Sequence, residues 1–303
     1  MNLIIDEQAD GIRIDSFLAD RIDNISRAKL QKAIKEGQIT VNNTSVKPSY
    51  ITKIGDKIEY NKQLSDAQPV IIKPENIPLD IVWEDENMAV INKPSGMLTH
   101  PTTNETEHTL VNALLYKFGD NLSDLNGEMR RGIVHRLDRN TSGLIMIAKN
   151  NKTHEFLVNE MKEKRFTKKY LAVVKGVLDK DNIIINTPIG RHLSQPHKMA
   201  VNGKDAKESL SIVNVIKRFK DATLIEVTLV TGRTHQIRVH LSSIGHPVYN
   251  DTLYGFGKMK IKTEEQVLQS YKLGFTKPFT EERINLEIAP DEKVKKVINF
   301  VSK

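Results

Sequence analysis

A stretch with three prolines divides this chain of 303 residues into two parts with different patterns. Residues 61–78, NKQLSDAQPVIIKPENIP, show little hydrophobic periodicity, and proline interrupts both helices and the interior of sheets. Domains of roughly 100–200 residues would divide a chain of this length into two. The sequence therefore predicts a small domain at residues 1–62, a linker at 63–78 and a larger domain at 79–303.

The chain contains no cysteine, which excludes disulfides, thiolate zinc sites and thiol nucleophiles and is typical of a reducing compartment. The N-terminus MNLIIDEQADGIRIDSFL has acidic residues where a signal peptide would be apolar. No apolar run approaches the ~18 residues of a membrane-spanning helix. We therefore expect a soluble cytoplasmic protein that has no membrane partner.

Two helices are predicted in the small domain. The first has an apolar face formed by residues at helical spacing, Ile14, Phe17, Leu18 and Ile22. The second starts after Ser26, a favourable N-cap, and stops before Gly37. Its exposed positions are basic: Arg27, Lys29, Lys32 and Lys35.

Short strands follow these helices, one at residues 39–41 before the turn Asn42-Asn43 and one ending at Tyr60. The segment SRAKLQKAIKEGQITVNN and the later GDKI resemble the S4 RNA-binding domain. The resemblance implies an α/β module whose basic helix contacts RNA through Arg27, Lys29 and Lys32. A net charge of +7 favours a polyanionic partner, because Lys and Arg neutralise phosphates. A generic helix pair with a solvated, charged face is the alternative.

The larger domain is predicted to be α+β, with a mostly antiparallel mixed sheet flanked by helices. Short apolar runs rich in β-branched residues indicate strands: MAVIN (88–92), GLIMIAK (143–149), YLAVVKGV (170–177) and TLIEVTLV (223–230). Helical patterns lie around 108–117 and 151–163. Helices and strands do not alternate strictly, which argues against a doubly wound fold.

Residues 131–150, RGIVHRLDRNTSGLIMIAKN, hold the densest group of residues suited to chemistry. His135, Arg136, Asp138 and Arg139 lie within five residues, and a short polar turn and an apolar strand follow. Nearby positive charge favours the ionised form of a carboxylate, which can then act as a nucleophile or base. Spacing alone, however, favours a salt-bridged loop without chemistry.

HRLDRNTSGLIMIAK resembles the signature of the RluA-type pseudouridine synthases. The resemblance covers about residues 79–295, since VWEDENMAVINKPSGMLTHP and LGFTKPFT also resemble that family. It implies that Asp138 is the catalytic aspartate, that Arg136 fills the space left by a flipped nucleotide, and that Arg139 contacts RNA. Asn140 departs from the aspartate common in the family, outside the catalytic position.

A second segment, TGRTHQIRVH (231–240), follows a predicted strand. If that strand continues, one face carries alternate residues, Thr234, Gln236, Arg238 and His240. A metal site is disfavoured because His235 and His240 lack helical i,i+4 spacing and have no acidic residue between them. The resemblance implies that Arg238 pairs with the catalytic aspartate and that Arg233 contacts RNA. An arginine used only for folding is the alternative.

The third segment is KRFTKKYLAVVKG (164–176), in which basic residues precede Tyr170 at the start of an apolar strand. Bases stack on aromatic rings while cations hold the backbone, so the segment suits RNA. The resemblance places Tyr170 against the target base, with Lys168 and Lys169 as RNA contacts. A tyrosine packed in the core would give the same pattern.

The resemblance implies an enzyme that isomerises uridine to pseudouridine with an aspartate nucleophile and without cofactor or metal. The combination with an S4-like domain suggests 23S ribosomal RNA, or a precursor of the large subunit, as partner, and we expect a monomer. Two other functions are weighed against it. A non-enzymatic RNA-binding factor would retain the fold without the chemistry, and a glycosidase or base hydrolase would need a second carboxylate.

Overall fold

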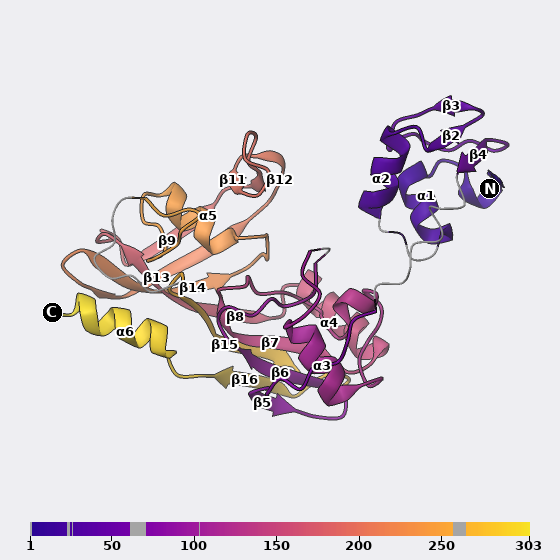
Figure 1. Cartoon of the computed structure of the whole chain (residues 1–303). Coiled ribbons are helices and arrows are strands. Elements are labelled where there is room, and N and C mark those ends of the chain that lie inside the picture. The colour runs from indigo at the N-terminus through magenta and orange to yellow at the C-terminus, as the bar shows by residue number, and fades with distance from the viewer. Residues whose placement is uncertain (1, 23–24, 26, 61–70, 103, 257–264) are drawn as a thin grey trace. The chain divides into compact units, whose positions relative to one another are not determined.

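The computed structural model describes all residues except 1, 23–24, 26, 61–70, 103 and 257–264, and divides the chain into two compact units, Met1–Ile71 and Ile72–Lys303 (Figure 1). The predicted N-cap Ser26 and the first half of the predicted linker lie outside the described residues. No helix in the described ranges is long and apolar enough to cross a membrane. Each unit is considered separately below.

The first unit combines two helices with a four-stranded sheet ordered β1-β4-β2-β3. Its elements are β1 (Asn2–Ile4), a 3-10 turn (Glu7–Ala9), α1 (Ile14–Arg21), α2 (Arg27–Lys35), β2 (Ile39–Val41), β3 (Thr44–Ser45) and β4 (Lys57–Tyr60). Asn42 and Asn43 both adopt positive φ, 48° and 61°, which makes the tight turn between β2 and β3 that this pair predicts. The predicted helix pair and short strands are confirmed.

A buried carboxylate joins the two helices of this unit. Asp15 of α1 accepts hydrogen bonds from Arg13, from Arg27 of α2 at 2.9 Å and from Gln31 at 2.6 Å. The bonds from Arg13, followed by those from Arg27 and Gln31, hold the pKa of Asp15 well below its usual range although burial opposes them. Arg27, a predicted RNA contact, therefore also has a structural role in joining the two helices.

The second unit is built on a large mixed sheet ordered β5-β6-β7-β15-β8-β14-β13-β9, with β16 also paired to β15. Only the β7–β15 pair is parallel among the described strands of this sheet. The strands are β5 (Ile81–Glu84), β6 (Met88–Lys93), β7 (Ser142–Ala148), β8 (Thr167–Lys175), β9 (Asn182–Asn186), β13 (Leu210–Arg218), β14 (Ala222–Leu229), β15 (Leu268–Thr276) and β16 (Arg283–Glu287). The predicted α+β class with a mostly antiparallel sheet is confirmed.

Helices cover both faces of this sheet. The remaining elements are α3 (Leu110–Phe118), a 3-10 turn (Glu128–Arg130), α4 (Asn151–Lys162), β10 (Ile189–Arg191), β11 (Met199–Val201), β12 (Lys204–Lys207), α5 (Gln236–Ser243) and α6 (Glu292–Val301). One buried cluster joins alternate strand residues to α3 and α5, and clusters on the opposite face join the intervening residues to α4 and α6. The short strands β10–β12 form a separate small sheet (Figure 1).

The segment 231–240 does not continue as a strand, so that prediction was wrong. The chain turns after β14, where the Gln236 amide oxygen accepts hydrogen bonds from the Thr231 hydroxyl at 2.8 Å and the Arg233 N–H at 3.0 Å. Helix α5 then starts at Gln236, and Ile237 and Leu241 pack into the core at i,i+4 spacing. The i,i+4 spacing of Ile237 and Leu241 indicates the helix correctly, whereas the alternation of polar residues does not.

Gly143 lies where β7 meets β15, and we expect Gly143→Ala to destabilise the fold by about 2–5 kcal/mol. Its φ is +109°, and an added Cβ would lie 2.0 Å from the Ser270 carbonyl oxygen. Gly245→Ala is the matched control, because its φ is also positive (+85°) but nothing lies within 4 Å. We expect the control to cost about 1–2 kcal/mol in urea denaturation. Equal losses would show that the close approach to Ser270 is unimportant.

Candidate active site

The three segments predicted to carry the chemistry meet at one cavity of about 560 Å³ in the second unit. Its walls come from residues 134–141, from the end of α4 through Tyr170, and from 229–238. This volume lies in the range of about 300–1,000 Å³ found for small-molecule sites. The fold thus brings together residues far apart in the sequence, such as Asp138 and Arg238, which are 100 positions apart.

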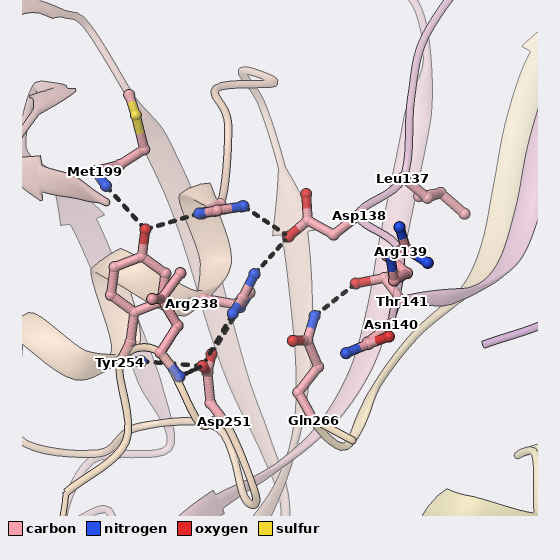
Figure 2. A network of polar contacts seen from close by, with 12 residues as sticks. Leu137, Asp138, Arg139, Asn140, Thr141, Met199, Arg238, Asp251, Tyr254 and Gln266 are labelled. Carbon is pink, nitrogen blue, oxygen red and sulfur yellow. Dashed lines mark hydrogen bonds and ion pairs between the residues drawn. The ribbon is translucent and has the colours of Figure 1, made fainter. Parts of the chain in front are cut away.

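Asp138 is held by Arg238, as the resemblance implied. The Arg238 Nη1 donates to Asp138 Oδ2 at 3.0 Å, while Nε and Nη2 of the same guanidinium donate to Asp251 at 2.7 and 2.9 Å (Figure 2). The side chain of Asp251 is fully buried, whereas that of Asp138 is 17% exposed and lines the cavity. Burial would raise the pKa of Asp251, but the hydrogen bonds from Arg238 outweigh this effect and lower it.

A tight turn carries Asp138, because the Thr141 N–H donates to the Asp138 carbonyl at 3.1 Å. Gln266 donates to the Thr141 hydroxyl at 3.0 Å, and the Thr99 hydroxyl donates to the Leu137 carbonyl at 2.8 Å. These bonds fix the loop on both sides of the aspartate, and Figure 2 shows the one from Gln266 to Thr141. Because the backbone of this loop is fixed, the position of the Asp138 side chain is set before a ligand binds.

Two further side chains, Lys93 and His135, support the segments around this loop. Lys93, which is fully buried, donates to the carbonyls of Pro94, Met97 and Arg139 at 2.7, 2.8 and 3.0 Å. Burial lowers the pKa of Lys93 to about 7, but three carbonyl acceptors match the three N–H bonds of its ammonium form. His135 accepts the N–H of Met146 at 3.0 Å, and burial lowers its pKa to about 3, which keeps the ring neutral.

Tyr170 lies within β8 rather than at its start, and it lines the cavity. Strand alternation sends Lys168 to the same side as Tyr170 and Lys169 to the other. Lys168 lines the cavity, whereas Lys169 donates to Glu226 at 2.8 Å on the opposite face. Burial raises the pKa of Tyr170 above its ordinary value, so its hydroxyl keeps its proton at neutral pH.

The other predicted RNA contacts are distributed over both units. Arg136 is exposed at the cavity, and Arg233 lines it while its Nε donates to the Glu208 carbonyl at 3.0 Å. Arg139 points away from Asp138 and pairs with Glu105. In the first unit, Arg27, Lys29 and Lys32 are exposed on α2.

Sequence reasoning missed three residues of the network around Asp138. Asp251 shares Arg238 with it, the Nε2 of His235 lies 3.8 Å from its Oδ2, and Tyr254 contacts the Nδ1 of His235 at 2.7 Å. Asp251 and Tyr254 lie in a loop after α5. The spacing of residues in that loop does not indicate a functional site. His235 and His240 have different partners, since His240 is buried against Ser211 and Thr187.

Asp138 is the one carboxylate among the residues that line this cavity. Asp251 cannot supply a second one, because its oxygens are occupied by Arg238 and by the N–H groups of Leu253 and Tyr254. A two-carboxylate hydrolysis is therefore not supported. Cationic walls, a single ion-paired carboxylate and an aromatic ring define the site of an enzyme that acts on a base of a nucleic acid.

Comparison with known proteins identifies the family. The family model described as RNA pseudouridylate synthase matches residues 87–243, and that of the S4 domain matches residues 12–58. An uncharacterized RNA pseudouridine synthase of Aquifex aeolicus is 42% identical over 95% of this chain and 93% of its own length. The chain belongs to the RNA pseudouridylate synthase family and is an RNA pseudouridine synthase, an isomerase, with an N-terminal S4 domain.

Two other proteins are also similar to this chain. The ribosomal large subunit pseudouridine synthase D of Zymomonas mobilis is 35% identical over 93% of this chain and 91% of its own length. The structure of human RNA pseudouridylate synthase domain containing 1 aligns with a TM-score of 0.59, covering 76% of this chain and 97% of that one at 24% identity. The structural match supports the fold of the catalytic domain.

Proposed function

We propose that this enzyme converts one or more uridines of 23S ribosomal RNA to pseudouridine, with Asp138 as nucleophile and without a cofactor. The observation that carries the proposal is the position of Asp138, the one carboxylate lining the cavity, held by Arg238 at 3.0 Å. A planar guanidinium partner holds the carboxylate in a fixed orientation. Among the described residues none donates a hydrogen bond to its Oδ1, which remains available for reaction.

In the proposed reaction, Asp138 attacks either the uracil ring or C1′ of the ribose. The glycosidic C–N bond breaks, the uracil turns, and a carbon–carbon bond forms to the same ribose. Nothing is oxidised or reduced overall. The ring of Tyr170 stacks on the base and keeps it in the cavity until the new bond forms.

The target uridine must leave its stack to enter the cavity. We propose that Arg136, exposed at the cavity, fills the space that the base vacates. Lys168 and Arg233 line the same cavity and contact phosphates, and Arg27, Lys29 and Lys32 of the S4 domain add further contacts. Arg139 and Lys169 contribute more weakly, because each already has a carboxylate partner.

The substrate proposal rests on the S4 domain and on a relative named for the ribosomal large subunit. An enzyme for ribosomal RNA works where ribosomes assemble, which places this one in the cytoplasm.

Pseudouridine mapping of ribosomal RNA tests the substrate. We expect a strain that lacks the enzyme to lose pseudouridine at one or a few positions of 23S RNA, and the wild-type gene to restore them. The small-subunit RNA of the same cells is the internal control. Losses confined to transfer RNA or to the small subunit would contradict the substrate, and release of free uracil in vitro would contradict isomerisation.

A further inference from the structure

We propose that Tyr254 and His235 form a positioning relay for Asp138, anchored at its outer end on the small sheet β10–β12. The proposal rests on the function proposed above, because it concerns the same carboxylate. Figure 2 shows the chain of contacts, which runs from the backbone N–H of Met199 through the Tyr254 hydroxyl toward Asp138. Neither Tyr254 nor His235 is part of the motif that carries the aspartate.

The backbone of His235 is held in an unusual conformation. His235 has φ 55° and ψ 20°, in the left-handed region, immediately before α5. Such a conformation costs roughly 1–2 kcal/mol for a residue other than glycine and is concentrated at functional sites. Here it directs the imidazole into the cavity wall, where Nε2 lies 3.8 Å from Asp138 Oδ2 and Nδ1 lies 2.7 Å from the Tyr254 hydroxyl.

The contacts of Tyr254 determine where the imidazole proton lies. Its hydroxyl oxygen accepts the Met199 N–H at 2.9 Å, so its own proton is free to point at Nδ1 of His235. Donation to Nδ1 leaves the proton of a neutral imidazole on Nε2, facing Asp138. Burial lowers the pKa of His235 and so favours the neutral ring, although Asp138 opposes this effect.

The relay gives Asp138 a second donor beside Arg238. Both donors face Oδ2, and Figure 2 shows no contact from the residues drawn to Oδ1. A separation of 3.8 Å is longer than a hydrogen bond, but catalytic hydrogen bonds often shorten when substrate binds. The guanidinium of Arg238 also lies 5.0 Å from the centre of the Tyr254 ring, which ties the two donors together.

The outer end of the relay lies on a part of the molecule suited to sense RNA. Met199 begins β11, which pairs with β10 so that Met199 faces Arg191. Arg191, Lys204 and Lys207 are exposed on this small sheet. RNA bound there would fix the Met199 N–H and, through Tyr254, the orientation of the imidazole beside Asp138.

Tyr254→Phe tests the relay, because it removes the hydroxyl and keeps the ring against Arg238. We expect kcat to fall about 10- to 100-fold, the loss of one hydrogen bond near a charged group, with KM for RNA unchanged. Tyr271→Phe is the matched control, since it removes another tyrosine hydroxyl, one bound to Glu226 outside the site. Its kcat should equal that of the wild type.

The pH profile separates positioning from structure. The charged and titratable groups that face His235 are Asp138, Arg238, Asp251, Arg136 and Tyr254. Without the Tyr254 hydroxyl, Nδ1 is free to take up a proton, so the acid limb of kcat should move to higher pH. His235→Asn, which suits the left-handed backbone, should remove that limb, and the double variant should be no slower than His235→Asn alone.

Each other outcome overturns the relay. The relay is contradicted if Tyr254→Phe keeps the pH profile of the wild type. It is also contradicted if the losses of kcat add in the double variant, or if KM rises while kcat stays constant. A fall in kcat that follows a fall in melting temperature, and disappears on cooling, would assign Tyr254 to structure alone. Failure of the wild-type enzyme to form pseudouridine would instead contradict the proposed function and leave these comparisons without a substrate.

Discussion

Asp138→Asn is expected to reduce pseudouridine formation by at least about a thousandfold, because an amide is neither a nucleophile nor a base at this position. The fold should survive the change. The Asn oxygen can still accept from Arg238, and the guanidinium keeps both of its bonds to Asp251. We therefore expect a change in the free energy of unfolding below about 1 kcal/mol and undiminished RNA binding.

Pseudouridine formation on 23S RNA transcripts, measured with RNA affinity and a denaturation curve for each variant, checks this prediction. Asp120→Asn makes the same chemical change at an exposed position beyond α3 and should leave all three measurements unchanged. Residual activity of Asp138→Asn near that of the wild type would refute the nucleophile.

The architecture was predictable where one kind of signal dominated. Runs of β-branched residues identified β6, β7, β8 and β14, and Gly37 and Asn42-Asn43 marked the turns that follow α2 and β2. The segment 231–240 failed because its polar residues alternate while its apolar residues follow a helix. The same ten residues therefore fit both a strand pattern and a helix pattern. The packing of Ile237 and Leu241 into the core favours the helix.

The pairing of Asp138 with Arg238 came from the family resemblance rather than from spacing. The sequence predicted that the flanking arginines would favour the ionised form of Asp138, yet Arg139 pairs with Glu105 and Arg136 is exposed at the cavity. Local charge density therefore singled out the carboxylate that lines the cavity, although its partner in the structure is the distant Arg238. Asp251 left no local signal, because its role depends on a contact with α5 that only the folded chain creates.

Arg238→Met is expected to have two separate effects, since one guanidinium serves two carboxylates. It leaves Asp251, whose side chain is fully buried, without its cationic partner, and should destabilise the protein by about 3–5 kcal/mol. It also removes the donor that holds Asp138 Oδ2, and so should slow pseudouridine formation at temperatures where the variant is folded. Unfolding in urea and initial rates measured on the folded protein separate the two.

The double variant Arg238→Met/Asp251→Asn distinguishes a positioning role from a structural one. Neutralising Asp251 removes the uncompensated buried charge, while the amide oxygen can still accept the N–H groups of Leu253 and Tyr254, at 2.9 and 3.0 Å in the parent protein. We expect stability to recover by about 2 kcal/mol, because the charge rather than the hydrogen bonds carries most of the cost. Activity should not recover, because nothing replaces the Nη1 donor beside Asp138. Parallel recovery of rate and stability would instead show that Arg238 only supports the fold, and that the carboxylate does not need a guanidinium to react.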